Sequence, residues 1–168
     1  HFTPELLDRV AKQGVRTLPV ALQVGAGTFK LVETETLGEH SMHREWCHVP
    51  CETLRALHAL AAPRAAGAAR LIVVGTTGVR TLESLPNPIP SVSELGAEGW
   101  STDTRLLIQP GFEFRFTDAL LTNFHLPKST LLSLVGAFVG LDRLKHLYAE
   151  AQTRGYRFFS YGDAMLIV

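Results

Sequence analysis

The stretch DALLTNFHLPKSTLLSLVGAFVG, at residues 118–140, constrains the fold of this chain more than any other. An apolar approach runs into a short polar segment and then into Pro127. Pro127 disfavours helical dihedrals at Leu126, and Ser129 or Thr130 can cap the free N–H groups of a helix that starts behind it. The stretch therefore predicts a strand or loop, a polar turn, and a helix whose N-terminus is directed back at that turn.

Such a helix end presents free N–H donors and a partial positive charge, which suit an electron-rich ligand. The same residues also fit a capped helix over a core with a structural histidine, so the stretch alone does not decide between a site and a core. A similar unit occurs earlier in the chain, where the apolar run at residues 70–74, typical of a buried strand, leads into Gly75-Thr76-Thr77 and a helical pattern. Ligands gather where the strands of an α/β sheet end, so both turns are candidate binding elements.

The remaining patterns predict a mixed α/β domain, because helical and apolar strand segments alternate along the chain. Residues 86–104 lack periodicity and predict a long loop. Helices are expected after Thr3-Pro4, over residues 50–62, and in a segment that ends at Gly155. Strands are expected at residues 15–24, in a short segment that ends at Val49, and at residues 70–74, 105–109, 112–116 and 164–168.

Composition bounds the class of protein. The chain has 168 residues, 46% hydrophobic and 19% charged, with zero net charge, so it suits one domain with a real core and attracts nucleic acid only through a local patch. Its two cysteines, Cys47 and Cys51, disfavour a disulfide framework or zinc ribbon and suggest a reducing compartment. No apolar run approaches the roughly 18 residues of a membrane span. The chain begins with His1, which we interpret as the start of a fragment or processed product.

A glycine-rich segment, VGAGTF at residues 24–29, follows the first predicted strand. Gly25 and Gly27 allow positive φ and close approach of the backbone to a ligand. The segment lacks the GxGxxG-plus-helix context of a dinucleotide site, so an ordinary bend is the alternative.

The segment EHSMHREW, at residues 39–46, holds two histidines and two glutamates. In an extended conformation His43 and Glu45 share one face, whereas His40 and His43 share a face only on a helix. A histidine and a carboxylate on one face can form a base and its orienting partner, or two metal ligands, or merely the polar side of a half-exposed strand. No third ligand is evident, which disfavours a metal site.

Six motifs together resemble one family, the S-adenosylmethionine:tRNA ribosyltransferase-isomerases of queuosine biosynthesis. They are VGAGTF, EHSMHREW, VGTTGVRTLES, PGF, DALLTNFHLPKSTLLSLVGAF and YRFFSYGDAMLI, in family order and over nearly the whole chain except residues 86–104. The resemblance implies the large mixed α/β domain of that family, here without its inserted small β-barrel domain. Residues 1–168 would then be the C-terminal part of that catalytic domain, with the N-terminal half and the barrel absent.

The resemblance also implies a reaction. The ribosyl moiety of S-adenosylmethionine moves onto 7-aminomethyl-7-deazaguanine at the wobble position of a tRNA anticodon and is isomerised, giving epoxyqueuosine. Adenine and methionine are released, and no metal takes part. Such chemistry needs a base for the proton next to the sulfonium, a hydrogen-bond donor for the departing adenine, and carboxylate or aromatic neighbours for the cation.

The family motifs supply candidate residues for these roles. The catalytic candidates are His43 and His125 as base or acid, Glu45 to orient His43, His40, and Asp163. The S-adenosylmethionine-binding candidates are Gly25, Gly27, Thr28, Thr76, Thr77 and Asn123. The candidates for tRNA phosphates or the methionine carboxylate are Arg80, Lys128 and Arg157. We expect residues 123–125, residues 75–77 and His43 to surround one cavity.

Two other functions remain open on the sequence. A non-catalytic tRNA-binding fragment of the same family would keep the fold motifs without the full site. An ordinary methyltransferase is disfavoured because its glycine motif is missing. The expected setting is cytoplasmic, without a membrane, as a monomer or weak oligomer. A domain cut through its sheet should expose apolar surface, for which residues 15–24 and 112–116 are the candidates.

Overall fold

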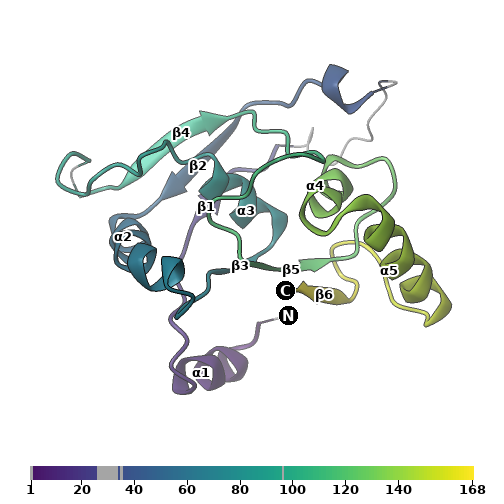
Figure 1. Cartoon of the computed structure of the whole chain (residues 1–168), viewed down its shortest axis with the longest axis horizontal. Coiled ribbons are helices and arrows are strands. Elements are labelled where there is room, and N and C mark those ends of the chain that lie inside the picture. The colour runs from purple at the N-terminus through teal and green to yellow at the C-terminus, as the bar shows by residue number, and fades with distance from the viewer. Residues whose placement is uncertain (1, 26–33, 35, 96) are drawn as a thin grey trace.

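The structure is a computed structural model that describes residues 2–25, 34, 36–95 and 97–168. It confirms the mixed α/β class: helices pack around two separate three-stranded sheets (Figure 1). The first sheet is antiparallel in the order β1-β2-β4, and the second has the order β3-β5-β6, with β3 parallel and β6 antiparallel to β5. The strands are β1 (Ala21–Leu22), β2 (Glu45–Val49), β3 (Ile72–Val74), β4 (Trp100–Thr104), β5 (Ala119–Asn123) and β6 (Ala164–Ile167).

Two of the described helices, α1 and α4, begin at the capping residues that the sequence places there. Thr3 accepts a hydrogen bond from the Leu6 N–H at the start of α1, and Ser129 accepts one from the Leu132 N–H at the start of α4. These side chains satisfy donors that the first helical turn leaves unpaired. The α-helices are α1 (Pro4–Lys12), α2 (Cys51–Ala65), α3 (Thr76–Glu83), α4 (Thr130–Val139) and α5 (Leu141–Thr153), and a 3-10 turn, η2, spans Leu37–Glu39.

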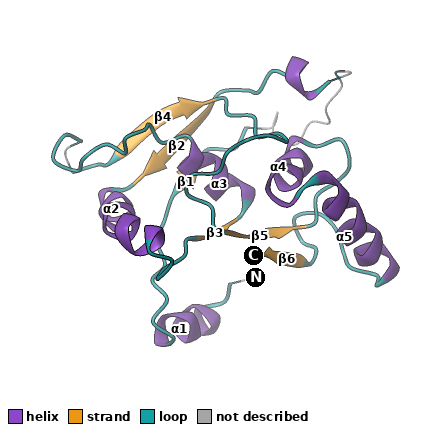
Figure 2. Ribbon diagram, in the orientation of Figure 1, coloured by secondary structure: helices purple, strands orange, loops and turns teal. Residues whose placement is uncertain are grey.

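Helix α3 joins the two sheets. It contacts β1 and β2 of the first sheet and β3 of the second (Figure 2). Its apolar residues Val79 and Leu82 are buried in one core cluster with Val49 of β2 and Leu120 of β5. Burial of apolar area at about 25 cal/mol per Å² is the main stabilising contribution of such a cluster. One core therefore spans both sheets and fixes the start of α3 relative to β5.

Among the described residues, one face of the second sheet is more deeply buried than the other. The row Val73, Leu120 and Ile167 is buried, as expected of neighbours in register. On the opposite face Ile72 and Val74 are 52% exposed and Leu166 is 58% exposed, because strand residues alternate between faces. The expectation that residues 70–74 form a buried strand is therefore wrong for the outer face.

Of the two predicted exposed apolar surfaces, residues 15–24 do include an exposed apolar side chain, since Val15 is 50% exposed, whereas the phenylalanines of residues 112–116 turn into the core. Phe116 is buried, and Phe112 and Phe114 pack against the core, with edge-to-face ring contacts between Phe112 and Phe114 and between Phe114 and Phe138. Residues 112–116 are not a strand. Their alternation reflects a loop that folds aromatic rings into the core, which is a pattern that sequence alone cannot distinguish from a strand.

Three further boundaries differ from the predictions. The strand predicted at residues 105–109 is not formed, whereas β4 (Trp100–Thr104) lies inside the segment predicted as a loop. Residues 15–24 contain only the short β1. The polar sequence WSTDT of β4 carries no apolar alternation, and it forms a strand because all five residues pair with β2. Tertiary pairing has overridden local propensity here.

Candidate functional site

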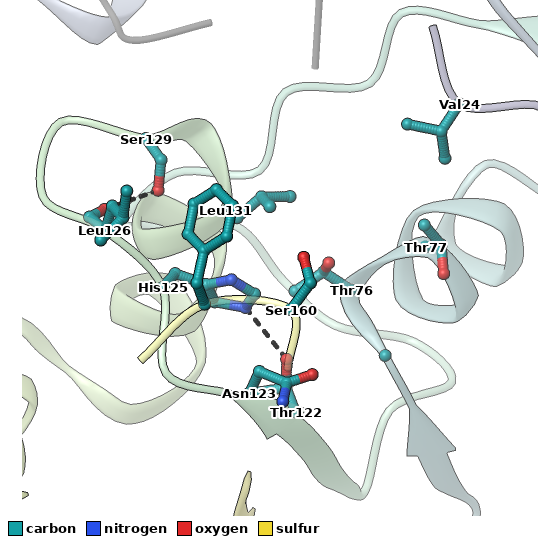
Figure 3. A pocket seen from close by; sticks show the side chains of 12 residues that line it. Val24, Thr76, Thr77, Thr122, Asn123, His125, Leu126, Ser129, Leu131 and Ser160 are labelled. Atoms are coloured by element: carbon teal, nitrogen blue, oxygen red, sulfur yellow. Dashed lines mark hydrogen bonds between the residues drawn. The ribbon is translucent and has the colours of Figure 1, made fainter. Parts of the chain in front are cut away.

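A pocket of about 400 Å³ lies where β3 and β5 end and where α3 and α4 begin (Figure 3). It is the arrangement predicted for the two strand–turn–helix units, since parallel strands carry their carboxyl ends to one edge of the sheet. The described residues that line it are Val24, Gly75, Thr76, Thr77, Thr122, Asn123, His125, Leu126, Ser129, Leu131, Phe159 and Ser160.

The turn between β3 and α3 depends on Gly75. Gly75 has φ +81°, a conformation that residues with a Cβ rarely adopt, and its N–H donates to the Leu121 carbonyl at 2.8 Å. This bond ties the end of β3 to β5. Helix α3 starts at the pocket with Thr76 and Thr77, and no side chain among the described residues caps it. An uncapped N-terminus leaves N–H donors for a ligand.

The second turn carries His125. Its Nε2 lies 3.0 Å from the Thr122 hydroxyl, and its backbone N–H donates to the Tyr148 hydroxyl at 2.9 Å. Figure 3 shows the imidazole among the lining side chains, with the bond to Thr122 drawn. Burial lowers the pKa of His125 from 6.5 to about 4, because the charged imidazolium loses its hydration. His125 is therefore neutral at pH 7, with one ring nitrogen as donor and the other as acceptor.

This lowered pKa makes stability pH-dependent. The unfolded chain binds a proton at His125 below pH 6.5 and the folded chain does so only near pH 4, so folding is progressively destabilised as the pH falls between these values. The free energy of unfolding falls between pH 7 and pH 4.5 in the wild type. We expect this fall to be roughly 2 kcal/mol smaller in His125→Gln. Urea unfolding at both pH values measures this difference.

The matched control is His146→Gln, which removes an exposed imidazole on α5. In this variant the free energy of unfolding should fall between pH 7 and pH 4.5 by as much as in the wild type. Equal pH dependence in His125→Gln and the wild type would contradict a buried neutral His125.

The loop before β6 closes one side of the pocket. The Asp163 carboxylate accepts hydrogen bonds from the Arg157 backbone N–H and guanidinium, each at 2.7 Å, and this guanidinium lowers the pKa of Asp163. The Asn123 amide donates to the carbonyls of Gly162 and Asp163. Asp163 and Asn123 thus hold the loop against the end of β5, and Asn123 also lines the pocket.

Glu45 has different partners from those the sequence suggested. It is 2% exposed, its Oε1 accepts the Gly25 N–H at 3.0 Å, and its Oε2 accepts from Arg80 Nη1. His43 is exposed and precedes β2. The expected common face of His43 and Glu45 is therefore wrong, because the strand starts only at Glu45 and turns that side chain inward.

Arg80 is also placed differently. It is 3% exposed, and its Nε donates to the Leu106 carbonyl at 3.1 Å while its Nη1 pairs with Glu45. It therefore offers no exposed guanidinium to a phosphate. Nor does it pair with Glu83, whose carboxylate accepts hydrogen bonds from Arg115, Phe116 and Thr117 in the loop before β5.

The expected single cavity is confirmed in part. Asn123, His125 and the turn at Gly75 lie around it, whereas His40 and His43 are not among its described lining residues. Lys128 is exposed next to the lining residue Ser129, and Arg157 is exposed two residues before the lining residue Phe159. Gly27 and Thr28 lie outside the described residues, and Gly25 is described through its bond to Glu45.

Sequence reasoning missed several lining residues. Thr122 belongs to the stretch at residues 118–140, but its role is evident only from the hydrogen bond between its hydroxyl and the His125 ring. Phe159 and Ser160 come from the polar-aromatic segment before β6, and both line the pocket. In the part of the chain that the structure describes, no three His, Cys, Asp or Glu residues gather in a way that could hold a metal ion. None of the described helices is long and apolar enough to span a membrane.

Comparison with known proteins gives consistent matches. The sequence model of a family described as "Queuosine biosynthesis protein" matches residues 1–167. The chain is 49% identical over 168 residues to the S-adenosylmethionine:tRNA ribosyltransferase-isomerase of Symbiobacterium thermophilum, which covers 100% of this chain and 47% of that protein. It is 50% identical over 167 residues to the protein of the same name from Aromatoleum aromaticum, covering 99% of this chain and 46% of that one.

Among solved structures, the chain is similar to the crystal structure of S-adenosylmethionine tRNA ribosyltransferase from Thermotoga maritima. The TM-score is 0.73 with 44% sequence identity, over 99% of this chain and 50% of the other. The chain thus spans about half the length of the curated relatives it matches.

Proposed function

This chain belongs to the family of queuosine biosynthesis proteins, and on that premise we propose that it supplies the S-adenosylmethionine-binding part of a tRNA ribosyltransferase-isomerase. The reaction transfers and isomerises the ribosyl moiety of S-adenosylmethionine onto 7-aminomethyl-7-deazaguanine at the anticodon wobble position, with release of adenine and methionine. S-adenosylmethionine is a consumed substrate in this reaction and tRNA is the acceptor.

The observation that carries the proposal is the pocket at the ends of β3 and β5, with a neutral histidine among its walls. Three of the predicted S-adenosylmethionine-binding residues, Thr76, Thr77 and Asn123, line it together with His125. The uncapped start of α3 adds backbone donors on the same side. These groups suit a ligand that is rich in hydrogen-bond acceptors.

His125 is the catalytic residue that this geometry favours. A neutral imidazole in a partly buried site can donate a hydrogen bond to a leaving heterocycle or accept a proton, without the cost of holding a charge there. The Thr122 hydroxyl, 3.0 Å from Nε2, fixes the ring. His40 and His43, which do not line the pocket among the described residues, are the alternative candidates for handling the proton.

Two exposed cations next to the pocket are proposed to contact tRNA phosphates. Lys128 lies between the lining residues Leu126 and Ser129, and Arg157 opens the loop that carries Phe159. With zero net charge over the chain, Lys128 is the local cation that would attract a polyanion, because Asp163 balances the charge of Arg157.

The test is adenine release by a chimera in which this chain replaces the matching half of the Thermotoga maritima protein. We expect adenine release that depends on both S-adenosylmethionine and tRNA carrying the precursor base. A chimera that binds this tRNA without releasing adenine would instead support a non-catalytic tRNA-binding role. Transfer of a methyl group to any acceptor would contradict the proposed reaction.

A further inference from the structure

Phe159 lines the pocket in a backbone conformation that phenylalanine rarely adopts. Its φ is +77°, and the residue is 47% exposed. Positive φ in a residue with a Cβ is disfavoured and persists only where the surrounding structure imposes it. Burial does not account for this conformation, because nearly half of the residue's surface remains in contact with solvent.

The surrounding loop imposes the conformation. The Phe159 N–H donates to the Phe124 carbonyl at 2.8 Å, and its carbonyl accepts the Gly162 N–H at 2.9 Å. A Cβ at Gly162 would lie 2.4 Å from the Arg157 carbonyl oxygen, so the loop closes tightly only with glycine there. The Arg157–Asp163 pair fastens the same loop from its ends.

The neighbouring ring has a different role. Phe158 packs against Phe124 and Tyr148, with centroids 5.3 and 5.7 Å away, and so contributes to an aromatic cluster under the loop. Among the described residues, Phe159 takes part in no such ring contact. The loop thus uses one phenylalanine for packing and presents the next one at the pocket.

The described part of the pocket wall carries no charged side chain. None of its described lining residues is Asp, Glu, Lys or Arg, and its polar side chains are hydroxyls, one amide and the neutral His125. Such a wall suits a flat, uncharged ring with hydrogen-bonding edges. A sulfonium cation or an amino-acid zwitterion needs charged partners, which these residues do not provide.

We infer that this pocket binds the adenine ring of S-adenosylmethionine and that Phe159 stacks on it. The inference rests on the proposed function, because that function makes S-adenosylmethionine the ligand. Of the parts of that molecule, adenine alone is both flat and uncharged. An exposed aromatic ring held by its backbone offers a stacking surface without ordering a flexible side chain on binding.

Titration of this chain with adenosine, followed by calorimetry, tests the inference. We expect binding by the wild-type chain and by Phe159→Trp, which keeps an aromatic face. Phe159→Ala should weaken adenosine binding roughly 10-fold or more, the usual effect of losing one base-stacking ring. Methionine should not compete with adenosine, and guanosine should compete poorly.

Two further variants separate stacking from folding. Phe159→Gly should weaken adenosine binding as much as Phe159→Ala does while keeping or raising the thermal midpoint, because glycine tolerates φ +77°. Tyr161→Ala is the matched control, since Tyr161 is in the same loop, 92% exposed and not a described lining residue. It should bind adenosine like the wild type.

The outcomes distinguish this inference from the proposed function. Unchanged adenosine binding in Phe159→Ala, no adenosine binding by the wild type, or a preference for guanosine would each overturn the inference. If adenosine binds as expected while the chimera releases no adenine, the adenine site stands and the proposed reaction fails.

Discussion

Glu45→Ala is expected to lower the free energy of unfolding by roughly 3–5 kcal/mol, the usual effect of removing one partner of a buried ion pair. Glu45 and Arg80 are 2% and 3% exposed. Without the carboxylate, the Arg80 charge stays buried with the Leu106 carbonyl as its remaining described partner, and the Gly25 N–H loses its acceptor. Because folded domains are only about 5–15 kcal/mol stable, a large part of the chain's stability depends on this pair.

Urea unfolding measures the effect, with an unchanged m-value as the sign that the same structure unfolds. The double variant Glu45→Leu, Arg80→Leu should recover much of the loss, because it leaves no buried charge unpaired. The control is Glu52→Ala, which breaks the exposed Arg16–Glu52 pair and should change stability by less than about 1 kcal/mol. A Glu45→Ala loss no larger than that of the control would refute the buried-pair interpretation.

The ion pair also shows what the sequence can and cannot predict. Glu45 stands out in the sequence as a carboxylate two residues from a histidine, which is a local pattern. Its actual partner, Arg80, is 35 residues away and becomes a neighbour only because α3 packs against β2. Local spacing identifies a residue worth testing, whereas the choice of partner is a long-range property of the core.

The two strand–turn–helix units are predictable because each is specified within about a dozen residues. Gly75 provides the positive φ at the first turn, and Pro127 with Ser129 sets the start of α4 at the second. Their meeting around one pocket follows from the rule that parallel strands end at the same edge. The strand β4 is not predictable in this way, because its residues gain their conformation from pairing with β2 rather than from their own pattern.

The site residues are likewise predictable where a local motif specifies them and unpredictable where long-range contacts do. His125 and Asn123 lie in a motif whose turn is evident from the residues themselves, and both line the pocket. Asp163 is a catalytic candidate on the sequence, yet its carboxylate is taken up by Arg157. Phe159 carries no sequence signal of its own, since its exposure depends on a positive φ that the hydrogen bonds of the folded loop impose.

His125→Ala is expected to slow adenine release by the chimera by roughly 10²–10⁴-fold, the usual contribution of a positioned acid or base. With adenine in the pocket, His125 would hydrogen-bond its ring as the bond to ribose breaks and electrons move onto the heterocycle. This interaction strengthens in the transition state, so kcat should fall more than the KM for S-adenosylmethionine changes. Rates are normalised to folded protein.

Variants of three residues then distinguish a catalytic His125 from a structural one. His125→Asn keeps a hydrogen-bond donor and should be slowed less than His125→Ala. Thr122→Val removes the hydroxyl 3.0 Å from Nε2 and should lower kcat by roughly 10-fold through loss of ring orientation. His43→Ala should keep near-full activity, because His43 is exposed and is not a described lining residue. If His43→Ala instead slows adenine release while His125→Ala does not, then His43 handles the proton. His125 would in that case be only a structural residue of the pocket.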